Sequence, residues 1–393
     1  MHDVIVIGGG PAGSRTAYML ARLGWGITVL EKKGVLGDKL CCTGIVGQEC
    51  VRSFDIEESV ILRKVKSARL FSPTKKMLYI KRDEYQASVL DRMAFDQAMA
   101  RRAQNAGAQY IFDSAVHDMR VTKEGVELYC EKKGGRFIAR AVVIASGCGT
   151  RLTEKMGSAK MAELVAGAQV DVVTRGQDEV EVYFGQEVAP GFFGWLVPTT
   201  AGNARVGLLS RQAPDKYLKG LLDSLASEGK IAADEWKPSH GAIPLRPLRN
   251  TSGERILVVG DAAGQVKPTT GGGIYYGMLC ADIAASVLNK ALHRGDLSAR
   301  SLSQYDREWK RKLGRELMVG YGARKLFERL NDQQIDRLFD IIEKNRIDVS
   351  LLESKDVSFD WHSQAIMNLL RRAVVARVFG GIRLPFRSSK NMQ

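Results

Sequence analysis

Cysteine is scarce in this sequence, and long apolar runs are missing. Six cysteines occur among 393 residues, and their positions lack the spacing of a metal cluster or a disulfide framework, which favours a reducing cytosol. The longest apolar runs, such as residues 141–145 and 256–260, are far shorter than the roughly 20 residues of a membrane-spanning helix. No signal peptide precedes the first strand-like stretch. We therefore expect a cytoplasmic protein without a metal site and with roughly two or three domains.

Acidic residues are also in deficit. The sequence has 44 Asp and Glu against 58 Lys and Arg, which gives a formal net charge of +14. A basic balance favours acidic partners, namely nucleic acid, anionic lipid or an acidic electron carrier, although a solvated surface without a partner has the same composition. We do not expect nucleic acid, because the basic residues are not interleaved with stacking aromatic side chains and no recognised module is present.

A glycine-rich turn stands near the start of the chain. Residues 3–7 read as a buried parallel strand, and the sequence Gly-Gly-Gly-Pro-Ala-Gly that follows has the pattern G-x-G-x-x-G. Gly8 permits the tight turn, Gly10 lets the backbone approach a pyrophosphate, and Gly13 lets the next helix pack close to the strand. Ala12 lies where the N–H groups of that helix point at phosphate. The pattern predicts a dinucleotide site.

An acid follows the glycines at the spacing that a ribose contact needs. The predicted helix runs to about Leu23, a second strand covers residues 27–30, and Glu31 stands at its end. A carboxylate there accepts hydrogen bonds from ribose hydroxyls and disfavours a 2′-phosphate. We therefore expect NAD or FAD rather than NADP.

A second glycine-rich stretch distinguishes between these two cofactors. Gly260 and Asp261 follow a predicted strand, and the run that ends in Gly273 and Ile274 opens a long helix. This stretch resembles the late G-D motif of FAD-dependent enzymes of the p-hydroxybenzoate hydroxylase superfamily. The resemblance implies FAD, with Asp261 on the ribityl chain and the backbone of Gly273 and Ile274 at the N1/C2=O edge of the flavin. A positive helix end stabilises the negative charge of a reduced flavin there.

Two other positions match the same superfamily, and one departs from it. The resemblance implies that Arg92, in an R-x-x-F-D helix, contacts the cofactor and that the backbone of Val116 meets the adenine. Ser146 and Gly147 stand where the superfamily usually carries Asp-Gly, which helps organise reduction by a nicotinamide. The reductant therefore stays open between an external donor such as ferredoxin or flavodoxin and transient NAD(P)H.

Residues 37–47 resemble a loop of the geranylgeranyl reductase family, flavoenzymes that saturate isoprenoid double bonds. The family motif is K-x-C-G-x-G-I/L, and this sequence has Cys42 in place of the first glycine. The resemblance implies that Cys41, Cys42 and Gly44 lie beside the isoalloxazine ring.

Residues 189–208 resemble the substrate motif P-x-x-Y-x-W-x-F-P of the same family. Phe193 replaces the Tyr, and Trp195 and Pro198 match; these are the expected substrate-lining residues. A fully apolar lining suits a hydrocarbon chain, because burial of apolar surface gains about 25 cal/mol per Å². The alternative is a strand whose aromatic side chains belong to an ordinary core.

The resemblance to the geranylgeranyl reductases implies a reaction. Hydride from N5 of reduced FAD reaches one carbon of an isoprenoid C=C bond on a lipid substrate, and a proton reaches the other carbon. No Asp or Glu stands out as the acid, so Cys41 is the candidate catalytic proton donor, with a buried structural thiol as the alternative reading. The rival functions are a flavin-dependent monooxygenase or halogenase of the same fold and a non-catalytic prenyl-lipid carrier.

These observations define an α/β fold class. We expect a Rossmann-like FAD-binding domain of the p-hydroxybenzoate hydroxylase type, a substrate domain with an antiparallel β-sheet, and C-terminal helices. The predicted domains are residues 1–65, 85–158 and 248–295 for FAD, residues 66–84 and 159–247 for substrate, and residues 296–393 for the helical region.

The C-terminal region reads as helical and charged. We expect Gly314, Gly320 and Gly322 to break its first helix. Beyond Asp360 the sequence has no acid, and apolar residues at helical spacing alternate with arginines. Such a basic amphipathic tail either binds the anionic inner face of a membrane, as a peripheral membrane protein does, or packs on the body of the protein.

Overall fold

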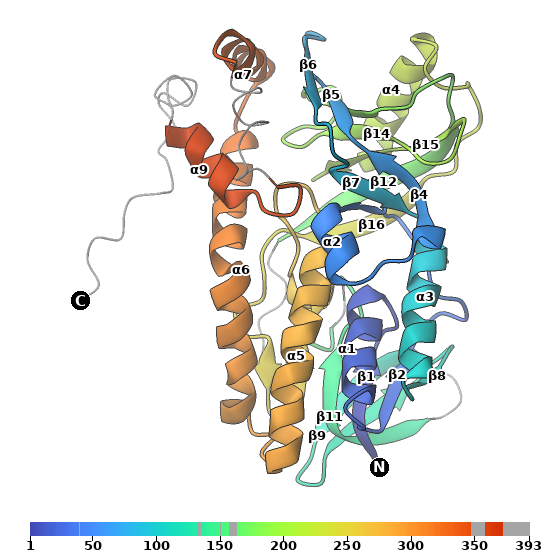
Figure 1. The fold of residues 1–393 in the computed structure, drawn as a ribbon, viewed down its shortest axis with the longest axis vertical. Helices are drawn as coiled ribbons and strands as arrows, with labels where there is room; N and C mark the ends of the chain where they lie inside the picture. Colours follow the sequence, from blue (N-terminus) through green and yellow to red (C-terminus); the bar gives the residue numbers. More distant parts are fainter. Residues whose placement is uncertain (39, 132–134, 150, 157–162, 347–357, 372–393) are drawn as a thin grey trace. The chain divides into compact units, whose positions relative to one another are not determined.

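The computed structural model describes residues 1–38, 40–131, 135–149, 151–156, 163–346 and 358–371 (Figure 1). The chain forms two compact units, each made of three segments. The first unit comprises Met1–Leu40, Asp91–Leu164 and Ala242–Leu317, and the second comprises Cys41–Leu90, Val165–Gly241 and Met318–Gln393. These units are defined by packing. The functional domains expected from the sequence are a separate division, and their bounds stay a prediction.

The first unit is built on an eight-stranded sheet in the order β17-β18-β11-β1-β2-β8, with β10 and β9 paired beside β11. Strand β1 pairs in parallel with β2 and β11, and β2 pairs in parallel with β8. The predicted strand, helix and second strand at the start of the chain are confirmed. The elements of this unit are β1 (His2–Ile7), α1 (Pro11–Ala21), β2 (Ile27–Leu30), α3 (Arg92–Asn105), β8 (Gln109–Ile111), β9 (Val116–Val121), β10 (Val126–Cys130), β11 (Arg136–Ile144), β17 (Ser252–Gly253), β18 (Ile256–Val258), α5 (Ile274–Arg294) and the start of α6 (Ala299–Phe327).

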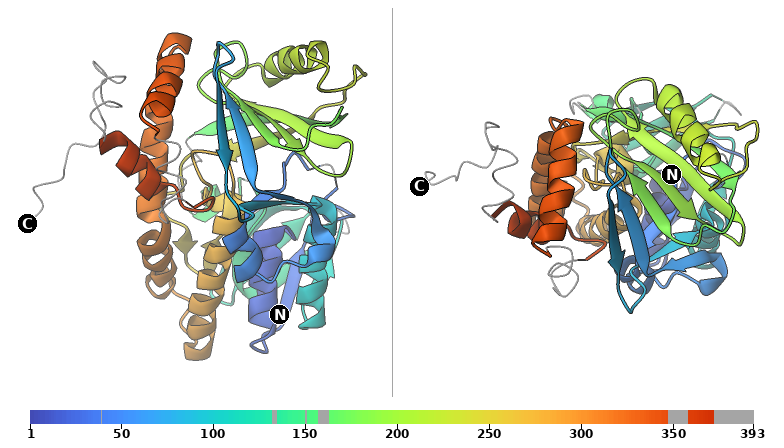
Figure 2. Two further views of the ribbon diagram at one scale, coloured as in Figure 1. Left: turned by 45° about the horizontal axis from the view of Figure 1, so that its top comes forward. Right: turned by 90° about the horizontal axis from the view of Figure 1, so that it is seen from above.

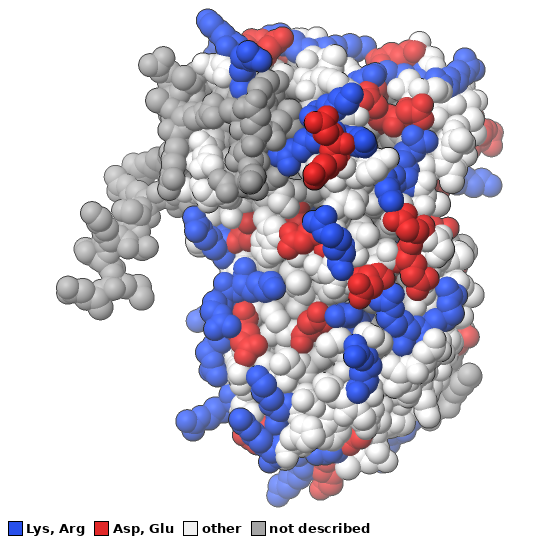
Figure 3. Space-filling view, viewed as in Figure 1, with Lys and Arg blue, Asp and Glu red and all other residues white. Residues whose placement is uncertain are grey.

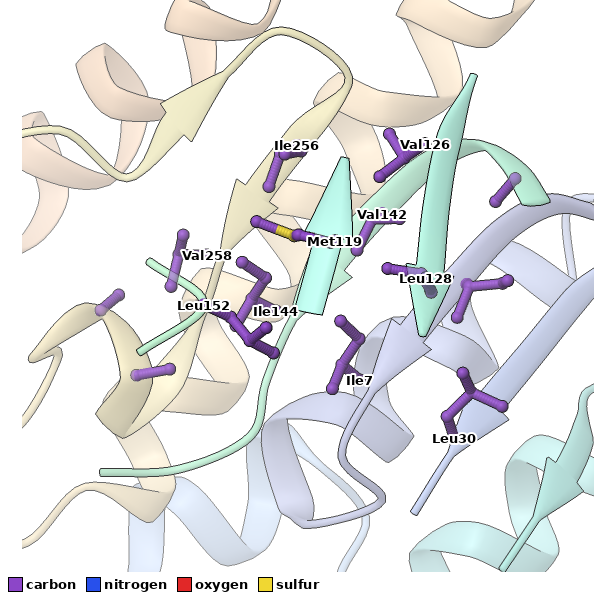
Figure 4. Packing of buried hydrophobic residues seen from close by; sticks show 14 of the residues in the cluster. Ile7, Leu30, Met119, Val126, Leu128, Val142, Ile144, Leu152, Ile256 and Val258 are labelled. Atoms are coloured by element: carbon purple, nitrogen blue, oxygen red, sulfur yellow. The ribbon is translucent and has the colours of Figure 1, made fainter. Parts of the chain in front are cut away.

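The core of the first unit lies on both faces of β1. Val4, Ile5 and Val6 are completely buried, as expected for a central parallel strand covered on both sides. Ile5 packs in a cluster with Val142 of β11 and with other apolar side chains of β10, β11 and β18 (Figure 4). This continuous apolar sheet fixes the glycine-rich turn at the end of β1.

The second unit contains a seven-stranded sheet in the order β16-β12-β15-β14-β13-β5-β6 and a three-stranded sheet in the order β3-β7-β4. Helix α4 lies across one face of the larger sheet (yellow-green in Figure 2) and buries Leu218, Leu221, Leu222 and Leu225. The elements are β3 (Ile45–Gly47), α2 (Gln48–Ser53), β4 (Ile61–Val65), β5 (Ser67–Phe71), β6 (Met77–Lys81), β7 (Ala87–Leu90), β12 (Leu164–Val173), β13 (Val180–Tyr183), β14 (Gly194–Pro198), β15 (Asn203–Ser210), α4 (Pro214–Ser227), β16 (Ser239–Pro244), α7 (Asp332–Lys344) and α9 (Ser363–Arg371).

The larger sheet is not purely antiparallel. Strands β12, β15, β14 and β13 pair antiparallel, as the sequence predicted, and so do β5 and β6. Strand β13, however, pairs with β5 in parallel, with Val180 opposite Ala68. No tight turn joins β5 to β13, and only strands joined by a hairpin are forced to be antiparallel.

Helix α6 is continuous, so the expectation that its glycines break it was wrong. It runs from Ala299 to Phe327 through Gly314, Gly320 and Gly322. A glycine in a helix interior costs only about 1 kcal/mol relative to alanine. The buried side chains of this helix include Leu302, Tyr305, Trp309, Leu313 and Leu317, and burial of one such stripe outweighs the cost of the glycines.

The start of the basic tail is helical. Helix α9 packs Leu369 and Leu370 against an apolar cluster that includes Leu326, Leu330 and Phe339, so part of its apolar face is covered by the second unit. Most of the tail's arginines lie beyond residue 371, outside the described residues. Binding of this tail to a membrane therefore stays a prediction.

Candidate cofactor and substrate site

The glycine loop, residues 8–13, has the geometry that its sequence predicts. Gly8 has φ of +102°, a region that favours glycine. A Cβ on Gly13 would lie 1.9 Å from the carbonyl oxygen of Gly8, so only glycine allows α1 to start this close to β1. A Cβ on Gly10, by contrast, would meet no atom within 4 Å. The backbone at Gly10 therefore borders open space, where a ligand can approach it.

Glu31 lies at the end of β2, directly beside this loop. Its carboxylate is almost fully buried and accepts hydrogen bonds from the N–H of Gly9 at 2.7 Å and of Lys33 at 2.9 Å. A carboxylate oxygen accepts more than one hydrogen bond, so these contacts orient Glu31 and leave acceptor capacity for a hydroxyl.

Two helix N-termini in this unit have no side-chain cap. Gly10 precedes α1 and Gly273 precedes α5, and neither helix receives a capping hydrogen bond from a side chain. Ala12 in the first turn of α1 packs against Gly260, whose Cβ would lie 3.0 Å from that of Ala12. The structure thus brings the two glycine-rich motifs together, and each motif leads into a helix N-terminus without a side-chain cap, an end that favours anionic groups.

Arg92 and Asp261 lie close enough for their charges to interact. Arg92 holds Asp96 on the next turn of α3, with its Nη2 3.1 Å from both carboxylate oxygens. Burial raises the pKa of Asp261, and the positive charge of Arg92 opposes that rise. Within the described part of the chain, no donor hydrogen-bonds the Asp261 carboxylate. Asp261 is therefore available to accept hydrogen bonds from a polyol.

Ser146 follows β11 at the position where the superfamily usually has Asp. Its Oγ is buried and has no hydrogen-bond partner among the residues that the structure describes. Cys148, two residues on, has its pKa raised to about 11, mainly by burial and further by the negative charge of Asp261. A buried hydroxyl without a partner costs free energy, which a bound polar ligand at this edge would recover.

Sequence patterns did not identify the side chains that hydrogen-bond to the backbone of the two glycine-rich motifs. Ser14 donates to the carbonyl of Gly9 at 2.8 Å and accepts from Tyr110 at 2.9 Å. Gln265, completely buried, accepts from the N–H of Gly260 at 2.8 Å and donates to Tyr305 at 2.8 Å. The motifs name neither Ser14 nor Gln265, and the tyrosines that hold these two side chains, Tyr110 and Tyr305, come from distant segments.

The first unit fits FAD. The open edge at Gly10, the partnerless Ser146 hydroxyl and the available Asp261 carboxylate are the features that a pyrophosphate and a ribityl chain would satisfy. Val116 begins β9 opposite Cys130 and is half-buried. Its contact with the adenine stays a prediction.

The loop with the two cysteines belongs to the second unit and is held on its sheet. Thr43 Oγ1 donates to Gln169 Oε1 at 3.2 Å, and Arg205 Nη1 donates to the carbonyl of Thr43 at 2.8 Å. Gly44 turns the chain with φ of +76°, a conformation that side chains disfavour. Arg205 is a further residue that the sequence did not reveal, because it anchors this loop from β15.

Cys41 carries a protonated thiol. Its Sγ lies 3.8 Å from the carbonyl oxygen of Gly167, and both Cys41 and Cys42 are free and half-buried. The pKa of Cys41 is raised to about 11, mainly by burial; a hydrogen bond with Ser239 lowers it, and the charge of Cys42 contributes to the rise. A thiol with this pKa holds its proton at neutral pH.

Trp195 lies on a largely apolar face of the larger sheet. Its indole covers Gly207, where a Cβ would lie 2.6 Å from the indole Cζ2. Phe193 packs edge-on against it, with ring centroids 6.0 Å apart. Trp195 shares its cluster with Val180, Val182 and Val197, so the structure brings the two expected aromatic side chains together on an apolar surface.

Pro198 does not lie on the face of the sheet that carries Trp195. It ends β14, is buried, and pairs with Ala204. Because successive residues of a strand point to opposite faces, Pro198 faces away from the side that carries Trp195 and Val197. Its place in a substrate lining stays a prediction.

The comparisons with known proteins agree with an FAD-binding fold. The family described as "FAD binding domain" matches residues 1–315. The digeranylgeranylglycerophospholipid reductase of Methanocaldococcus jannaschii is 31% identical over 355 residues, which cover 86% of this chain and 90% of the relative. The digeranylgeranylglycerophospholipid reductase 2 of Methanothermobacter thermautotrophicus is 31% identical over 360 residues, which cover 87% of this chain and 92% of the relative.

A solved structure shows the same fold. The geranylgeranyl bacteriochlorophyll reductase-like protein of Thermoplasma acidophilum superposes with a TM-score of 0.85 at 22% identity and covers 97% of this chain and 98% of its own. The chain therefore belongs to the FAD-binding proteins with the p-hydroxybenzoate hydroxylase-type fold, and its cofactor is FAD. Within that class it is a member of the geranylgeranyl reductase family.

A membrane-spanning helix is not found in the described part of the chain, where every helix is too short or too polar. A group of His, Cys, Asp and Glu side chains suited to a metal ion is likewise not found among the described residues.

Proposed function

We propose that this protein saturates C=C bonds of an isoprenoid chain, of the geranylgeranyl type, on a lipid substrate. The observation that carries the proposal is the match to curated digeranylgeranylglycerophospholipid reductases over 86% of this chain and 90% of the relative. When bound, reduced FAD supplies the hydride for such a reaction.

The residues of the second unit support an apolar substrate. Trp195 and Phe193 present aromatic surface beside the valines of β13 and β14. An isoprenoid chain has no hydrogen-bonding groups, so contact with such a face removes apolar area from water at about 25 cal/mol per Å². An isolated alkene is not polarised, and these side chains would contribute by positioning it.

Cys41 is the proton donor in this proposal. Saturation of a C=C bond adds a hydride to one carbon and a proton to the other. The thiol of Cys41 keeps its proton at neutral pH, because its pKa is raised to about 11. After the transfer the thiolate regains a proton from water. Thr43 and Arg205 hold the loop that carries this thiol.

The test uses full-length, FAD-loaded protein reduced with dithionite under anaerobic conditions. We incubate it with digeranylgeranylglycerophospholipid and follow the lipid by mass spectrometry, expecting a gain of two hydrogen atoms for each bond reduced. Cys41→Ser keeps the flavin spectrum and slows lipid reduction by about 100-fold, the size of a lost general acid. Cys130→Ser, a buried cysteine of the first unit, is the matched control.

Two results would contradict the proposal. Wild-type protein that is yellow as purified and is fully bleached by dithionite but leaves the lipid mass unchanged would refute alkene reduction. Full activity of Cys41→Ser with bound flavin would refute the acid role alone. An external electron donor and a peripheral contact with anionic membranes complete the proposal, and the net charge of +14 supports both.

A further inference from the structure

The outer face of α6 in the first unit is strongly basic. Arg300, Arg307, Arg311, Lys312 and Arg315 are all exposed there. Positions 300, 307, 311 and 315 fall on one side of a helix with 3.6 residues per turn, so their arginines form a row about 22 Å long. We call this row, with Lys310 and Lys312, the α6 basic face. Figure 3 shows more blue than red side chains along the side of the molecule that α6 occupies in Figure 1, with some red side chains among them.

The acids of the same helix offset only part of this face. Asp306 accepts hydrogen bonds from Thr251 at 3.1 Å and from Ser252, and it pairs with Lys310 at 3.0 Å. Glu308 is half-buried and accepts from Gln304 at 2.7 Å, and Glu316 is only 7% exposed. The four arginines of the row form no ion pair with any described residue. The face therefore keeps an excess of positive charge toward solvent.

The inner face of the same helix contacts the loop that carries Asp261. Tyr305 donates to the carbonyl of Val258 at 2.9 Å and accepts from Gln265 at 2.8 Å. Gln265 in turn holds the N–H of Gly260, the residue before Asp261. One helix, about 10 Å across, thus separates the α6 basic face from the cofactor loop.

We propose that the α6 basic face is the docking surface for an acidic electron-transfer protein that reduces the bound FAD. The proposal rests on the proposed function in one respect, since it takes the flavin to need an external reductant. Charge complementarity identifies the partner as acidic, and the contact of α6 with the Gly260–Asp261 loop identifies its role. A lipid surface fits less well, because Met318, which is 64% exposed at the end of this row, is the one large apolar side chain that the described residues of α6 expose to solvent.

The electrons balance for a partner of this class. Each alkene that is saturated gains two electrons and two protons. The docked protein gives up the two electrons, in one delivery or in two successive ones, and is itself oxidised. The protons come from water.

The experiment measures how fast an acidic iron–sulfur ferredoxin, reduced beforehand, bleaches the flavin of the full-length holoprotein in anaerobic stopped flow. The variant is R307E/R311E/R315E. At an ionic strength of about 0.01 M, where screening is weak, we expect its second-order rate constant to fall by about 10- to 100-fold, and the difference should vanish near 1 M salt. The control R101E/R120E/K123E changes the same charge at exposed positions outside α6 and should lower the rate less than about threefold.

The outcomes separate this inference from the proposed function. Bleaching by dithionite and dithionite-driven lipid reduction should be the same in variant and wild type; loss of lipid reduction in both would refute the proposed function and leave the bleaching assay valid. Equal ferredoxin rates in variant and wild type, an equal loss in the control, or no reduction of wild type by ferredoxin would overturn the docking surface. So would a variant that loses only its binding to vesicles containing phosphatidylglycerol.

Discussion

The two candidate sites of this protein are built from different parts of the polypeptide. In the first unit the candidate cofactor groups are those of the backbone, with an open glycine edge at Gly10 and an uncapped helix N-terminus after Gly273. In the second unit they are side chains on a sheet, with Trp195 and Phe193 foremost. Where two backbone segments are in contact, an added side-chain atom clashes and is not tolerated. On a surface made of side chains, the packing changes gradually with the size of the residue that is substituted.

The largest expected effect is at the glycine loop. Gly13→Ala places a Cβ 1.9 Å from the Gly8 carbonyl oxygen and should abolish FAD binding and lower stability. Gly10→Ala has room for its Cβ and an ordinary φ of −68°, so it should fold normally and bind FAD at least tenfold more weakly. Flavin titration and urea unfolding of both variants measure this contrast.

Gly220 is the matched control for that experiment. It lies exposed in α4 with no atom within 4 Å of its Cβ position, so Gly220→Ala should keep FAD and gain up to about 1 kcal/mol in stability. If Gly10→Ala binds FAD as tightly as wild type, the backbone at Gly10 is not a cofactor contact.

The next effect tests whether the first unit also depends on one pair of side chains. Arg92→Met leaves the carboxylate of Asp96, which is 3% exposed, without its partner. Loss of one member of a buried pair costs about 3 kcal/mol of unfolding free energy, measured in urea. The exposed pair Lys219–Asp223 has the same spacing, and Lys219→Met should cost less than about 0.5 kcal/mol. Equal losses would contradict the buried role of Arg92.

A smaller and graded effect is expected in the second unit. Trp195→Ala should raise the KM for lipid by about tenfold and lower stability by about 2 kcal/mol, with the flavin spectrum unchanged. Trp195→Phe should be nearly neutral in stability, because the indole N–H of Trp195 is buried without a partner among the described residues. A loss of flavin in Trp195→Ala would remove the contrast between the two sites.

The smallest effect concerns pH. The pKa of Cys41 is raised to about 11, so its thiol stays protonated as the pH rises and loses its proton only near that value. We therefore expect the rate of lipid reduction with dithionite-reduced protein to be level between about pH 7 and 9, with a fall only above that range. A fall centred near pH 8.5, the ordinary value of a cysteine, would contradict the environment described for this thiol.

Local patterns predicted the cofactor motifs well, because each lies on one continuous segment. The strand before Gly8, the helix after it and the place of Glu31 follow from spacing alone; the structure adds a hydrogen bond from the N–H of Gly9 to Glu31, and the ribose contact of Glu31 stays a prediction. The supporting residues were beyond such reasoning. Tyr110 and Arg205 act on partners that are distant in the sequence, and Gln265 is held by Tyr305, 40 residues away, so a spacing rule has no access to these contacts.

Helix α6 is a second example in which the local sequence pattern was not sufficient. Its glycines predicted a break in the helix. The helix is continuous, because the buried stripe that includes Tyr305 and Trp309 stabilises it. The arrangement of β13 beside β5 in parallel was likewise not encoded in either strand.

The sequence by itself determined the dinucleotide motifs, the membership in a flavoprotein family and the excess of positive charge, since these depend on residue identity and on short spacings. Only the tertiary structure decided that Arg92 lies near Asp261, that Pro198 faces away from Trp195, and that the arginines of α6 form one exposed row behind the cofactor loop. The physical reason is that burial and contacts between distant segments, rather than local conformational preference, determine the position of a side chain in the folded protein.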